Sequence, residues 1–511
     1  MFKNRLIKDT VLLTLMQIFL DTAALLLNVF ITRQLGAEAI GILTLTGSFL
    51  GLAGILSNGN AFLCVSRLVS EEMGKTNSNP NRILVHGIKL CLMLSTTVSV
   101  VLFAFAEPLS NKFFSGAEME EAIKFMPVAL VSGAVAACFK GYFNACRKSS
   151  VSAAGDIIEF IIKSLVIIVM TLTAKSPDEN SVCRIMIAGI IAGNIFSLGY
   201  CLVMFAKSRQ KYSGKCSLDF GKYMTYAFPI MGGSILTSAL SSTNDALIPM
   251  CLRQNGDSVN EALSRFGIFE AIVIPTLFFP SVVLCSMSGI IVSESARAKA
   301  SGNRERIKSL TGRLTRYTLI FAVFAGAVLM RFGDSIGELL GGGELAGKMI
   351  TIIAPVVPFI YMEIILEALI KGMGLQGFSS LNYLAEYAVR ISVVLIFVPK
   401  FGFYGIVASY YASNIIGNCS RFVKVMKYTE TPFKPFKIIA VPIIYAFLTM
   451  GTVELLTHII RIDGNTVPEM IVFGILWGMA YFGMFVGLDY GSFELPDRKV
   501  LCNIHKSVAQ K

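Results

Sequence analysis

Charged residues are scarce in this 511-residue chain: aspartate, glutamate, lysine and arginine together make up 15% of it. Soluble domains are typically about 25% charged and about 45–50% apolar. Here 54% of the residues are hydrophobic and the mean hydropathy is +0.67. A water-soluble globule of this length needs far more polar surface. The composition therefore excludes a cytosolic enzyme, a disordered chain and a small secreted scaffold, and it favours a polytopic α-helical membrane protein.

Histidine is also rare, and cysteine is scattered. The three histidines, His86, His458 and His505, are far apart in the sequence. The eleven cysteines form no C-x-x-C pair and no Cys/His cluster, which argues against a disulfide framework and against a zinc site. No GxSxG, HExxH, P-loop or DxD pattern stands out. We therefore expect neither a catalytic centre nor a cofactor or metal site.

Long apolar segments are the dominant feature of the chain. A bilayer core requires about 20 apolar residues per helix. Fourteen segments are candidate spans: 10–31, 40–65, 83–105, 124–145, 151–173, 184–206, 223–249, 266–292, 314–331, 349–370, 381–399, 402–420, 438–458 and 468–489. The second is interrupted by the polar run 57–60, and the seventh carries the polar run 241–245. The second and eighth are long enough that we expect a tilt or a break.

The distribution of lysine and arginine predicts the orientation of these spans. With the N-terminus placed inside, 31 of the 45 basic residues fall on the inner side, 11 on the outer side and three within spans. We therefore expect both termini in the cytoplasm and an even number of spans in the cell membrane. The net charge of +12 is then explained by basic cytoplasmic loops, and it does not indicate a nucleic-acid partner. The basic loop from Arg297 to Arg316 is interpreted as an orientation signal that rests on anionic lipid.

The two halves of the chain share a pattern. Pro127 is followed thirteen residues later by Lys140-Gly141, and Pro358 is followed at the same spacing by Lys371-Gly372. The order continues with matching serine pairs and with an acid that precedes a base by four residues, namely Ser149-Ser150 and Ser379-Ser380, then Glu159…Lys163 and Glu386…Arg390. The offsets relate the fourth span to the tenth and the fifth to the eleventh. The repeat unit is six helices, so the two copies face the same way, as in transporters built from parallel repeats.

Several stretches resemble motifs of a known transporter superfamily. They are Arg33–Gly41 after the first span, Phe139–Ala145 after the fourth, Pro229 with Asn244-Asp245 in the seventh, and Lys371–Gly374 after the tenth. On these motifs the chain resembles the multidrug/oligosaccharidyl-lipid/polysaccharide exporter superfamily over about residues 1–490. Within that superfamily it is most similar to the polysaccharide-biosynthesis branch and to the stage V sporulation protein B group.

The resemblance implies an all-α fold with two six-helix lobes around a central cavity. Residues 1–210 would form the N-lobe, 211–430 the C-lobe, 431–490 two additional helices and 491–511 a cytoplasmic tail. It implies a monomeric flippase without covalent chemistry, which moves an undecaprenyl-pyrophosphate-linked oligosaccharide or cell-wall precursor from the inner to the outer leaflet by alternating access. In lipid II flippases the two additional helices form a groove for the lipid tail.

A pair of residues in the first span differs from the lipid II flippases. Those relatives carry an Arg-Asp pair in the first helix, where this chain has Leu27 and Asn28. The departure favours a different glycolipid or a changed mode of binding. A role in spore or general envelope assembly would follow from the subgroup resemblance alone.

A pyrophosphate group inside a membrane requires cations or helix N-termini that face the cavity. Lys163 and Arg390 lie deepest in their spans, and each follows a glutamate by four residues, so each can form an intrahelical ion pair. Two interpretations stay open: the pairs neutralise one another for structural reasons, or substrate phosphate competes for the cation while the glutamate takes a proton. The candidate substrate-binding residues are Asp21, Asn28, Lys140, Glu159, Lys163, Asn244, Asp245, Glu270, Glu386 and Arg390. The coupling ion would be H⁺ or Na⁺.

Two other functions are weighed against the flippase. A cation-coupled multidrug exporter of the same superfamily would usually have twelve helices and cavity carboxylates for cationic drugs. A membrane glycosyltransferase or ligase would need a catalytic carboxylate motif beside a large outer loop, whereas every outer loop here is under about 20 residues. The first of these is kept as the alternative function.

Small and aromatic residues give further structural expectations. Gly189 and Gly193 in the sixth span, and Gly232 and Gly233 in the seventh, predict close helix packing. Trp477 is the single tryptophan, and its place in the last span is interpreted as an anchor at the membrane interface.

Overall fold

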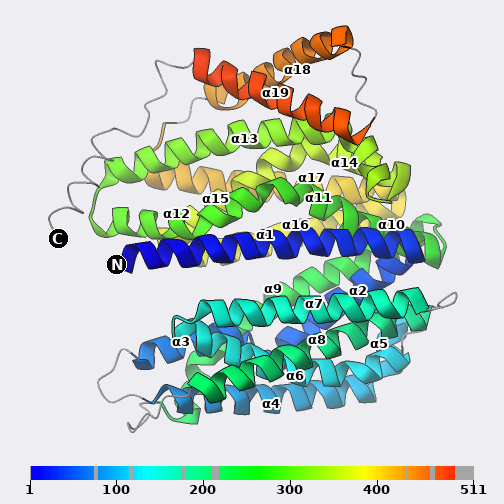
Figure 1. Ribbon diagram of the computed structural model, residues 1–511, viewed down its shortest axis with the longest axis vertical. Helices are drawn as coiled ribbons and strands as arrows, with labels where there is room; N and C mark the ends of the chain where they lie inside the picture. The colour runs from blue at the N-terminus through cyan, green and yellow to red at the C-terminus, as the bar shows by residue number, and fades with distance from the viewer. Residues whose placement is uncertain are drawn as a thin grey trace.

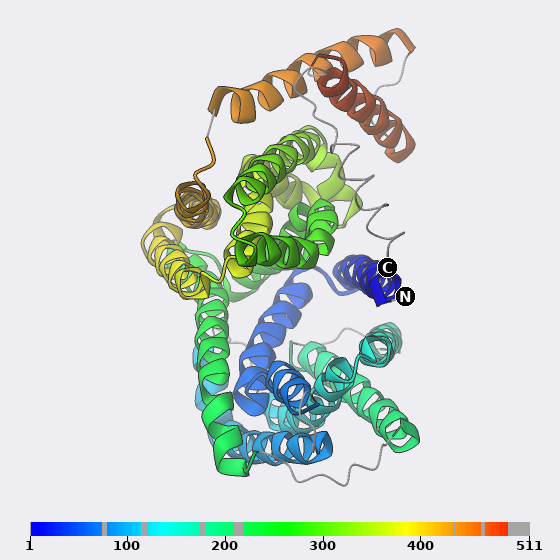
Figure 2. The same ribbon diagram turned by 90° about the vertical axis from the view of Figure 1, so that its left-hand side faces the viewer.

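The computed structural model describes residues 2–73, 79–113, 120–173, 179–208, 218–432, 435–460 and 466–488. Almost all of these residues are helical, and the described ranges contain no strand. The helices run side by side in two bundles, and one further pair of helices lies outermost beside the second bundle (Figures 1 and 2). The all-α architecture predicted from composition is confirmed.

The first bundle, called the N-terminal bundle here, comprises α2 to α8. Its helices are α2 (Ala37–Asn58), α3 (Ala61–Met73), α4 (Pro80–Ala104), α5 (Ala106–Phe113), α6 (Glu120–Ala145), α7 (Ser149–Thr173) and α8 (Glu179–Ser208). The helices α4, α6 and α8 pack around α2, and α7 packs on α8 and α6. The first helix, α1 (Phe2–Leu35), contacts both α7 and α12 and lies between the two bundles in Figure 1.

The second bundle, called the C-terminal bundle here, comprises α10 to α17. Its segments are α10 (Val259–Ile268), η1 (Phe269–Val273), α11 (Ile274–Phe278), η2 (Phe279–Ser281), α12 (Val282–Ala300), α13 (Arg304–Leu339), α14 (Gly343–Ile353), η3 (Ala354–Val356), α15 (Val357–Gly372), α16 (Gln376–Phe401) and α17 (Phe403–Thr429). The long helix α9 (Phe220–Asn255) packs against α2 and α4 and also against α16, so it connects the two bundles (Figure 2).

The expected breaks in the second and eighth spans are present. Between α2 and α3, Gly59 and Asn60 both have φ near 56°, in the left-handed region that ends a helix. The eighth span passes from α10 through a π-helical segment, η1, which contains Glu270, before α12 begins. Such π segments occur frequently at functional sites. The seventh span shows no interruption, because α9 continues through the polar run 241–245.

Each of the fourteen predicted spans lies, to within one residue, inside one helix or one run of consecutive helical segments. Within the described residues, eleven segments are long and apolar enough to cross a membrane. The helices α7, α9 and α17 are outside that set, yet each packs along helices that belong to it. The chain is therefore a multi-pass α-helical membrane protein.

The two bundles meet where α2 crosses α10. A Cβ added at Gly41 would lie 1.9 Å from the carbonyl oxygen of Leu263, and one added at Gly267 would lie 2.3 Å from the backbone nitrogen of Gly41. Only glycine permits two helix backbones to come this close. Gly41 ends the sequence motif that begins at Arg33, so this motif forms part of the junction between the bundles.

Repeat-related glycines have matching surroundings in the two bundles. A Cβ at Gly141 on α6 would lie 2.6 Å from the carbonyl oxygen of Phe62 on α3. A Cβ at Gly372 on α15 would lie 2.6 Å from the carbonyl oxygen of Val292 on α12. The Lys-Gly motifs at residues 140 and 371 therefore allow the same close helix approach in both halves, in agreement with the predicted repeat.

The sequence predicts close helix packing at four glycines within spans, and the structure confirms it for two of them. Gly193 and Gly189 on α8 face α7 closely, since added Cβ atoms would lie 2.7 Å from the carbonyl oxygen of Glu159 and 3.0 Å from that of Lys163. The prediction for Gly232 and Gly233 is wrong, because no atom of another described helix lies within 4 Å of either added Cβ.

The outermost pair consists of α18 (Val441–Ile460), preceded by η4 (Phe436–Ala440), and α19 (Val467–Leu488). Trp477 on α19 is completely buried, and its indole Nε1 donates to Thr449 Oγ1 at 3.0 Å. Its ring packs edge-on against Phe324 of α13. The expectation of an interface anchor is therefore wrong, because α18 and α19 fold onto α13 and enclose the indole.

Candidate functional site

Lys140 is the centre of a charged cluster in the N-terminal bundle. Its ammonium Nζ lies 2.6 Å from Glu159 Oε2 and 2.7 Å from Asp156 Oδ1. Lys140 stands in the last turns of α6, and the two acids lie about one turn apart on α7. The Lys140 side chain is 11% exposed, whereas those of Asp156 and Glu159 are 50% and 36% exposed. The cluster therefore covers its cation and presents carboxylate oxygens at its surface.

The expected ion pair between Glu159 and Lys163 is not formed. Glu159 bonds to Lys140 on the neighbouring helix, where a largely buried ammonium needs a counter-charge. Lys163 Nζ instead lies 5.6 Å from the centre of the Phe160 ring. This half-buried ammonium has no ion pair with any other residue that the structure describes. It is thus a cation inside a span that can accept an anionic partner.

Arg421 is the centre of a second cluster, in the C-terminal bundle. The guanidinium is 0% exposed and lies between three carboxylates on two other helices. Its Nη1 is 2.9 Å from Glu386 Oε2, its Nη2 is 3.1 Å from Glu363 Oε1, and its Nε is 3.6 Å from Glu367 Oε2. Glu367 also accepts a hydrogen bond from Ser379. Three helices, α15, α16 and α17, are held together by this one cation.

Arg390 lies beside the Arg421 cluster and shares one of its acids. Its Nη2 is 3.4 Å from Glu386 Oε1, so this predicted intrahelical pair is present. The guanidinium carbon is 5.3 Å from the centre of the Tyr387 ring and 4.9 Å from that of Tyr410. Its Nε donates to Ser413 Oγ at 3.0 Å. Two aromatic rings thus contact this cation.

These groups line a cavity of about 490 Å³ inside the C-terminal bundle. The lining is contributed by α11, α12, α15, α16 and α17. Its polar members are Ser288, Glu363, Glu367, Lys371, Tyr383, Glu386, Tyr387, Arg390, Tyr410 and Asn414. The volume lies within the range of about 300–1,000 Å³ typical of small-molecule sites.

Asp245 on α9 is hydrogen-bonded at the junction of the bundles. Ser48 of α2 donates to Asp245 Oδ2 at 2.6 Å, and Asn244 Nδ2 donates to Asp245 Oδ1 at 3.3 Å. Ser242 in turn donates to the carbonyl oxygen of Ser48 at 2.9 Å. Asp245 therefore connects α9 to α2, and Asn244 bonds to its carboxylate from the same helix. The carboxylate of Asp245 also interacts electrostatically with Arg390.

Glu270 and Asn28 meet at the π-helical segment η1. Asn28 of α1 donates to the carbonyl oxygen of Ala271 at 3.0 Å. The neighbouring Glu270 interacts electrostatically with Asp245 and Arg390. Asp21 takes no part in this arrangement, since its carboxylate accepts a hydrogen bond from Gln17 on the same helix. The candidate acids of α9, η1 and α16 are thus gathered near Arg390, while Asp21 lies apart.

Arg421 is the functional candidate that sequence reasoning missed. The predicted span 402–420 ends one residue before Arg421, which places this residue in the adjoining basic loop. A signal was available, because Asn414, Asn418 and Arg421 follow one another at spacings of four and three residues, which places them on one helix face. Asn418 Oδ1 does accept a bond from Arg421 Nη1 at 3.3 Å.

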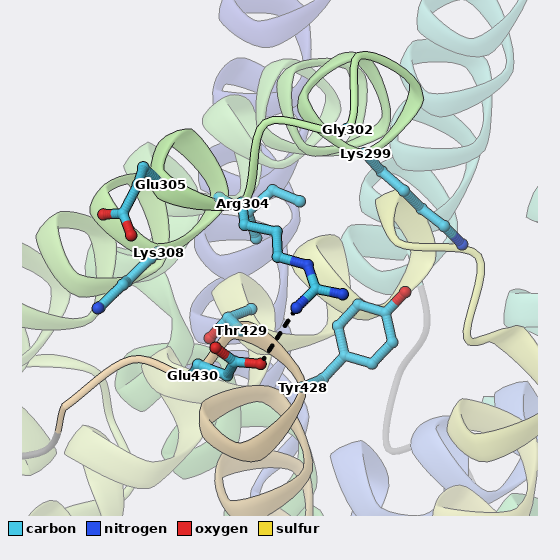
Figure 3. Close-up of a pocket in the computed structure, with 9 residues that line it drawn as sticks. Lys299, Gly302, Arg304, Glu305, Lys308, Tyr428, Thr429 and Glu430 are labelled. Carbon is cyan, nitrogen blue, oxygen red and sulfur yellow. Dashed lines mark ion pairs between the residues drawn. The ribbon is translucent and has the colours of Figure 1, made fainter.

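A second hollow, of about 280 Å³, lies between the start of α13 and the end of α17. It is lined by Lys299, Arg304, Lys308 and Tyr428, and the exposed pair Arg304–Glu430 crosses it at 3.5 Å (Figure 3). The ammonium groups of Lys299 and Lys308 point away from Arg304 in opposite directions (Figure 3). Because these cations diverge, the hollow does not form a convergent anion site.

An apolar pocket of about 420 Å³ lies between α13 and α18. It is lined by Val323, Ala327, Met330, Pro355, Pro358, Ile443, Phe447, Met450 and others, with Trp477 beneath them. Arg331 stands in this lining and pairs with Glu454 of α18 at 3.2 Å. The pocket can hold an aliphatic chain, with a charged pair beside it.

Comparison with known proteins gives the family. A model of the polysaccharide biosynthesis protein family matches residues 6–289, which is more than half of the chain. The chain belongs to this family. Among curated members, it is 20% identical over 420 residues to stage V sporulation protein B of Bacillus subtilis (strain 168), which covers 79% of this chain and 80% of that protein. It is 18% identical over 399 residues to sporulation protein YkvU of the same strain, covering 77% and 88%.

Solved structures share the fold of this family member. The lipid II flippase MurJ in an inward closed conformation superimposes with a TM-score of 0.71 at 15% identity, covering 93% of this chain and 99% of that one. A multidrug resistance MATE family transporter of the MOP superfamily, in an inward-facing conformation, gives a TM-score of 0.62 at 13% identity, covering 80% and 94%. The resemblance to this superfamily is therefore confirmed at the level of the fold.

Proposed function

We propose that this protein is a flippase for an undecaprenyl-pyrophosphate-linked oligosaccharide or cell-wall precursor, acting by alternating access of its two bundles in the cell membrane. The observation that carries the proposal is the pair of charged clusters within the spans. Lys140, Glu159 and Lys163 form one of them, and Glu386, Arg390 and Arg421 form the other. Ionisable groups inside a membrane are costly and are commonly part of a substrate path.

Lys163, a cation inside a span, supports a phosphate-bearing substrate. Lys163 is half-buried in α7 and has no ion pair with a residue of the described ranges, so an incoming pyrophosphate would supply its missing counter-charge. The apolar pocket beside α18 would accommodate part of the lipid tail. In this proposal both termini are cytoplasmic, the protein acts as a monomer, no covalent chemistry occurs, and H⁺ or Na⁺ provides the coupling.

One observation favours a second candidate, a cation-coupled multidrug exporter. The carboxylates of Asp156 and Glu159 are 50% and 36% exposed beside their covered cation, and exposed acids can receive a cationic drug. The fold is also shared with a MATE family transporter.

Native mass spectrometry of the protein extracted gently from its host membranes tests the two functions. The flippase predicts a co-purified polyprenyl-pyrophosphate glycan, which is lost in Lys163→Ala and Arg390→Ala and retained in the control Lys207→Ala, a substitution at an exposed position at the end of α8. Bound cationic amphiphiles without any glycolipid would contradict the flippase and support the exporter.

A further inference from the structure

The cavity of the C-terminal bundle has a chemistry that differs from a phosphate site. We propose that it is a subsite for an uncharged sugar unit of the transported glycan, an inference that rests on the proposed flippase function and assigns one part of the substrate to one bundle. The cavity holds about 490 Å³ and is lined by polar and aromatic side chains.

The charges around the cavity cancel. Glu363, Glu367 and Glu386 carry three formal negative charges, and Lys371, Arg390 and Arg421 carry three formal positive charges. Each acid lies within 4.0 Å of at least one of these cations. Arg421 lies behind the lining, and both cations of the lining itself, Lys371 and Arg390, already have a carboxylate partner. A dianionic pyrophosphate would therefore find no unpaired cation here, and it would lose its own hydration on entry. An uncharged ligand does not meet this cost.

The aromatic part of the lining matches the apolar face of a sugar ring. Tyr383, Tyr387 and Tyr410 all face the cavity. The ring centroids of Tyr383 and Tyr387 lie 5.1 Å apart at an angle of 45°, and the rings of Tyr387 and Tyr410 both contact the Arg390 guanidinium. Tyrosine offers an apolar ring together with a hydroxyl, which suits a ligand that has both C–H faces and hydroxyl groups.

One polar atom of the lining has hydrogen-bonding capacity to spare. Glu367 Oε2 lies 3.6 Å from Arg421 Nε and accepts no hydrogen bond within the described part of the chain. Buried polar groups are normally satisfied by protein, water or ligand. A sugar hydroxyl can donate a hydrogen bond to this carboxylate oxygen.

The test uses the full-length protein in lipid nanodiscs and two free sugars, N-acetylglucosamine and glucose, as probes. Saturation-transfer NMR is expected to detect binding of at least one of them. Ser288→Leu introduces a bulky apolar side chain at a lining position on α12, a helix that contributes no charged residue to the lining, and it is expected to abolish the signal. The matched control is Ser286→Leu on the same helix, outside the cavity lining. Both serines donate to the carbonyl oxygen three residues before them, so the two substitutions remove equivalent bonds.

Several results would overturn the subsite. They are the absence of any sugar signal in the folded wild type, an unchanged signal in Ser288→Leu, and displacement of the sugar by free pyrophosphate or by the cationic dye rhodamine 6G. If Ser288→Leu lowers the melting temperature more than Ser286→Leu, the smaller Ser288→Val replaces it in the same comparison.

The flippase proposal is tested separately. A co-purified polyprenyl-pyrophosphate glycan without binding of free sugar would refute the subsite and leave the flippase standing. Binding of free sugar, lost in Ser288→Leu, in a protein that carries no glycolipid would refute the flippase instead.

Discussion

Glu386 Oε2 lies 2.9 Å from Arg421 Nη1, between two helices that each belong to the interior of the C-terminal bundle. Both side chains are almost completely buried, with exposed fractions of 4% and 0%. The other carboxylate oxygen of Glu386 lies 3.4 Å from Arg390. One acid therefore bridges a structural cation, Arg421, and a cation at the cavity surface, Arg390.

The dependence of this bundle on Arg421 gives the first prediction. In Arg421→Met three acids lose their shared cation, and breaking a buried ion pair typically costs about 3–5 kcal/mol. We expect a loss of that size in the free energy of unfolding, measured by denaturant titration with Trp477 fluorescence. Lys427→Ala, at an exposed position on the same helix, is the control and is expected to stay within about 0.5 kcal/mol of the wild type. Equal stability of the two variants would refute the structural role.

The two lysines of the N-terminal bundle should behave differently. Lys140 holds Asp156 and Glu159, whereas Lys163 has no ion pair with a described residue. We therefore expect Lys140→Ala to lower the melting temperature and Lys163→Ala to leave it nearly unchanged. Binding of the lipid-linked glycan, followed by native mass spectrometry, should be lost in Lys163→Ala. A drop in stability without loss of glycan in that variant would assign Lys163 a structural role.

Most of the fold can be predicted from the sequence, because the helices and their breaks are determined by residues close together in the chain. Apolar length fixes where a helix can cross the bilayer, so all fourteen predicted spans coincide with helical segments. The break at Gly59 and Asn60 also follows from residue type, because glycine and asparagine tolerate the left-handed region. The position of Trp477 could not be predicted in this way. Its burial depends on how α18 and α19 fold onto α13, which no periodicity within α19 reveals.

The site was predictable only in part, for the same reason. The pair Glu386–Arg390 is four residues apart on one helix, and the sequence spacing predicts it. The equivalent spacing in Glu159 and Lys163 predicts a pair that is absent, because Lys140 on α6 competes for the same carboxylate. Arg421 joins acids that are 35 to 58 residues away in sequence, namely Glu386 and Glu363, and only the packing of α15, α16 and α17 brings them together.

Two glycines of α2 should respond differently to replacement by alanine, because Gly41 lies where α2 crosses α10 and Gly51 does not. In Gly41→Ala the new methyl group would overlap the carbonyl group of Leu263, so we expect destabilisation of about 1–3 kcal/mol, as for overpacked sites. Gly51→Ala meets no atom within 4 Å and should be neutral or stabilising by up to about 1 kcal/mol, because alanine restricts the unfolded chain. Denaturant unfolding of both variants makes the comparison, and equal effects would show that the backbones are not in close contact.

The single tryptophan allows a spectroscopic prediction about the outermost helices. Because Trp477 is fully buried and donates to Thr449 Oγ1, its emission should be blue-shifted and insensitive to aqueous iodide. Thr449→Val removes one acceptor while Ala446 keeps its carbonyl 3.3 Å from Nε1, so we expect a loss of about 1 kcal/mol in stability with the indole still protected. Thr452→Val is the control, since the Thr452 hydroxyl bonds within α18. Efficient quenching of the wild-type emission by iodide or by headgroup-labelled lipid would mean that α18 and α19 do not enclose Trp477, and the apolar pocket beside α13 would then be open to the bilayer.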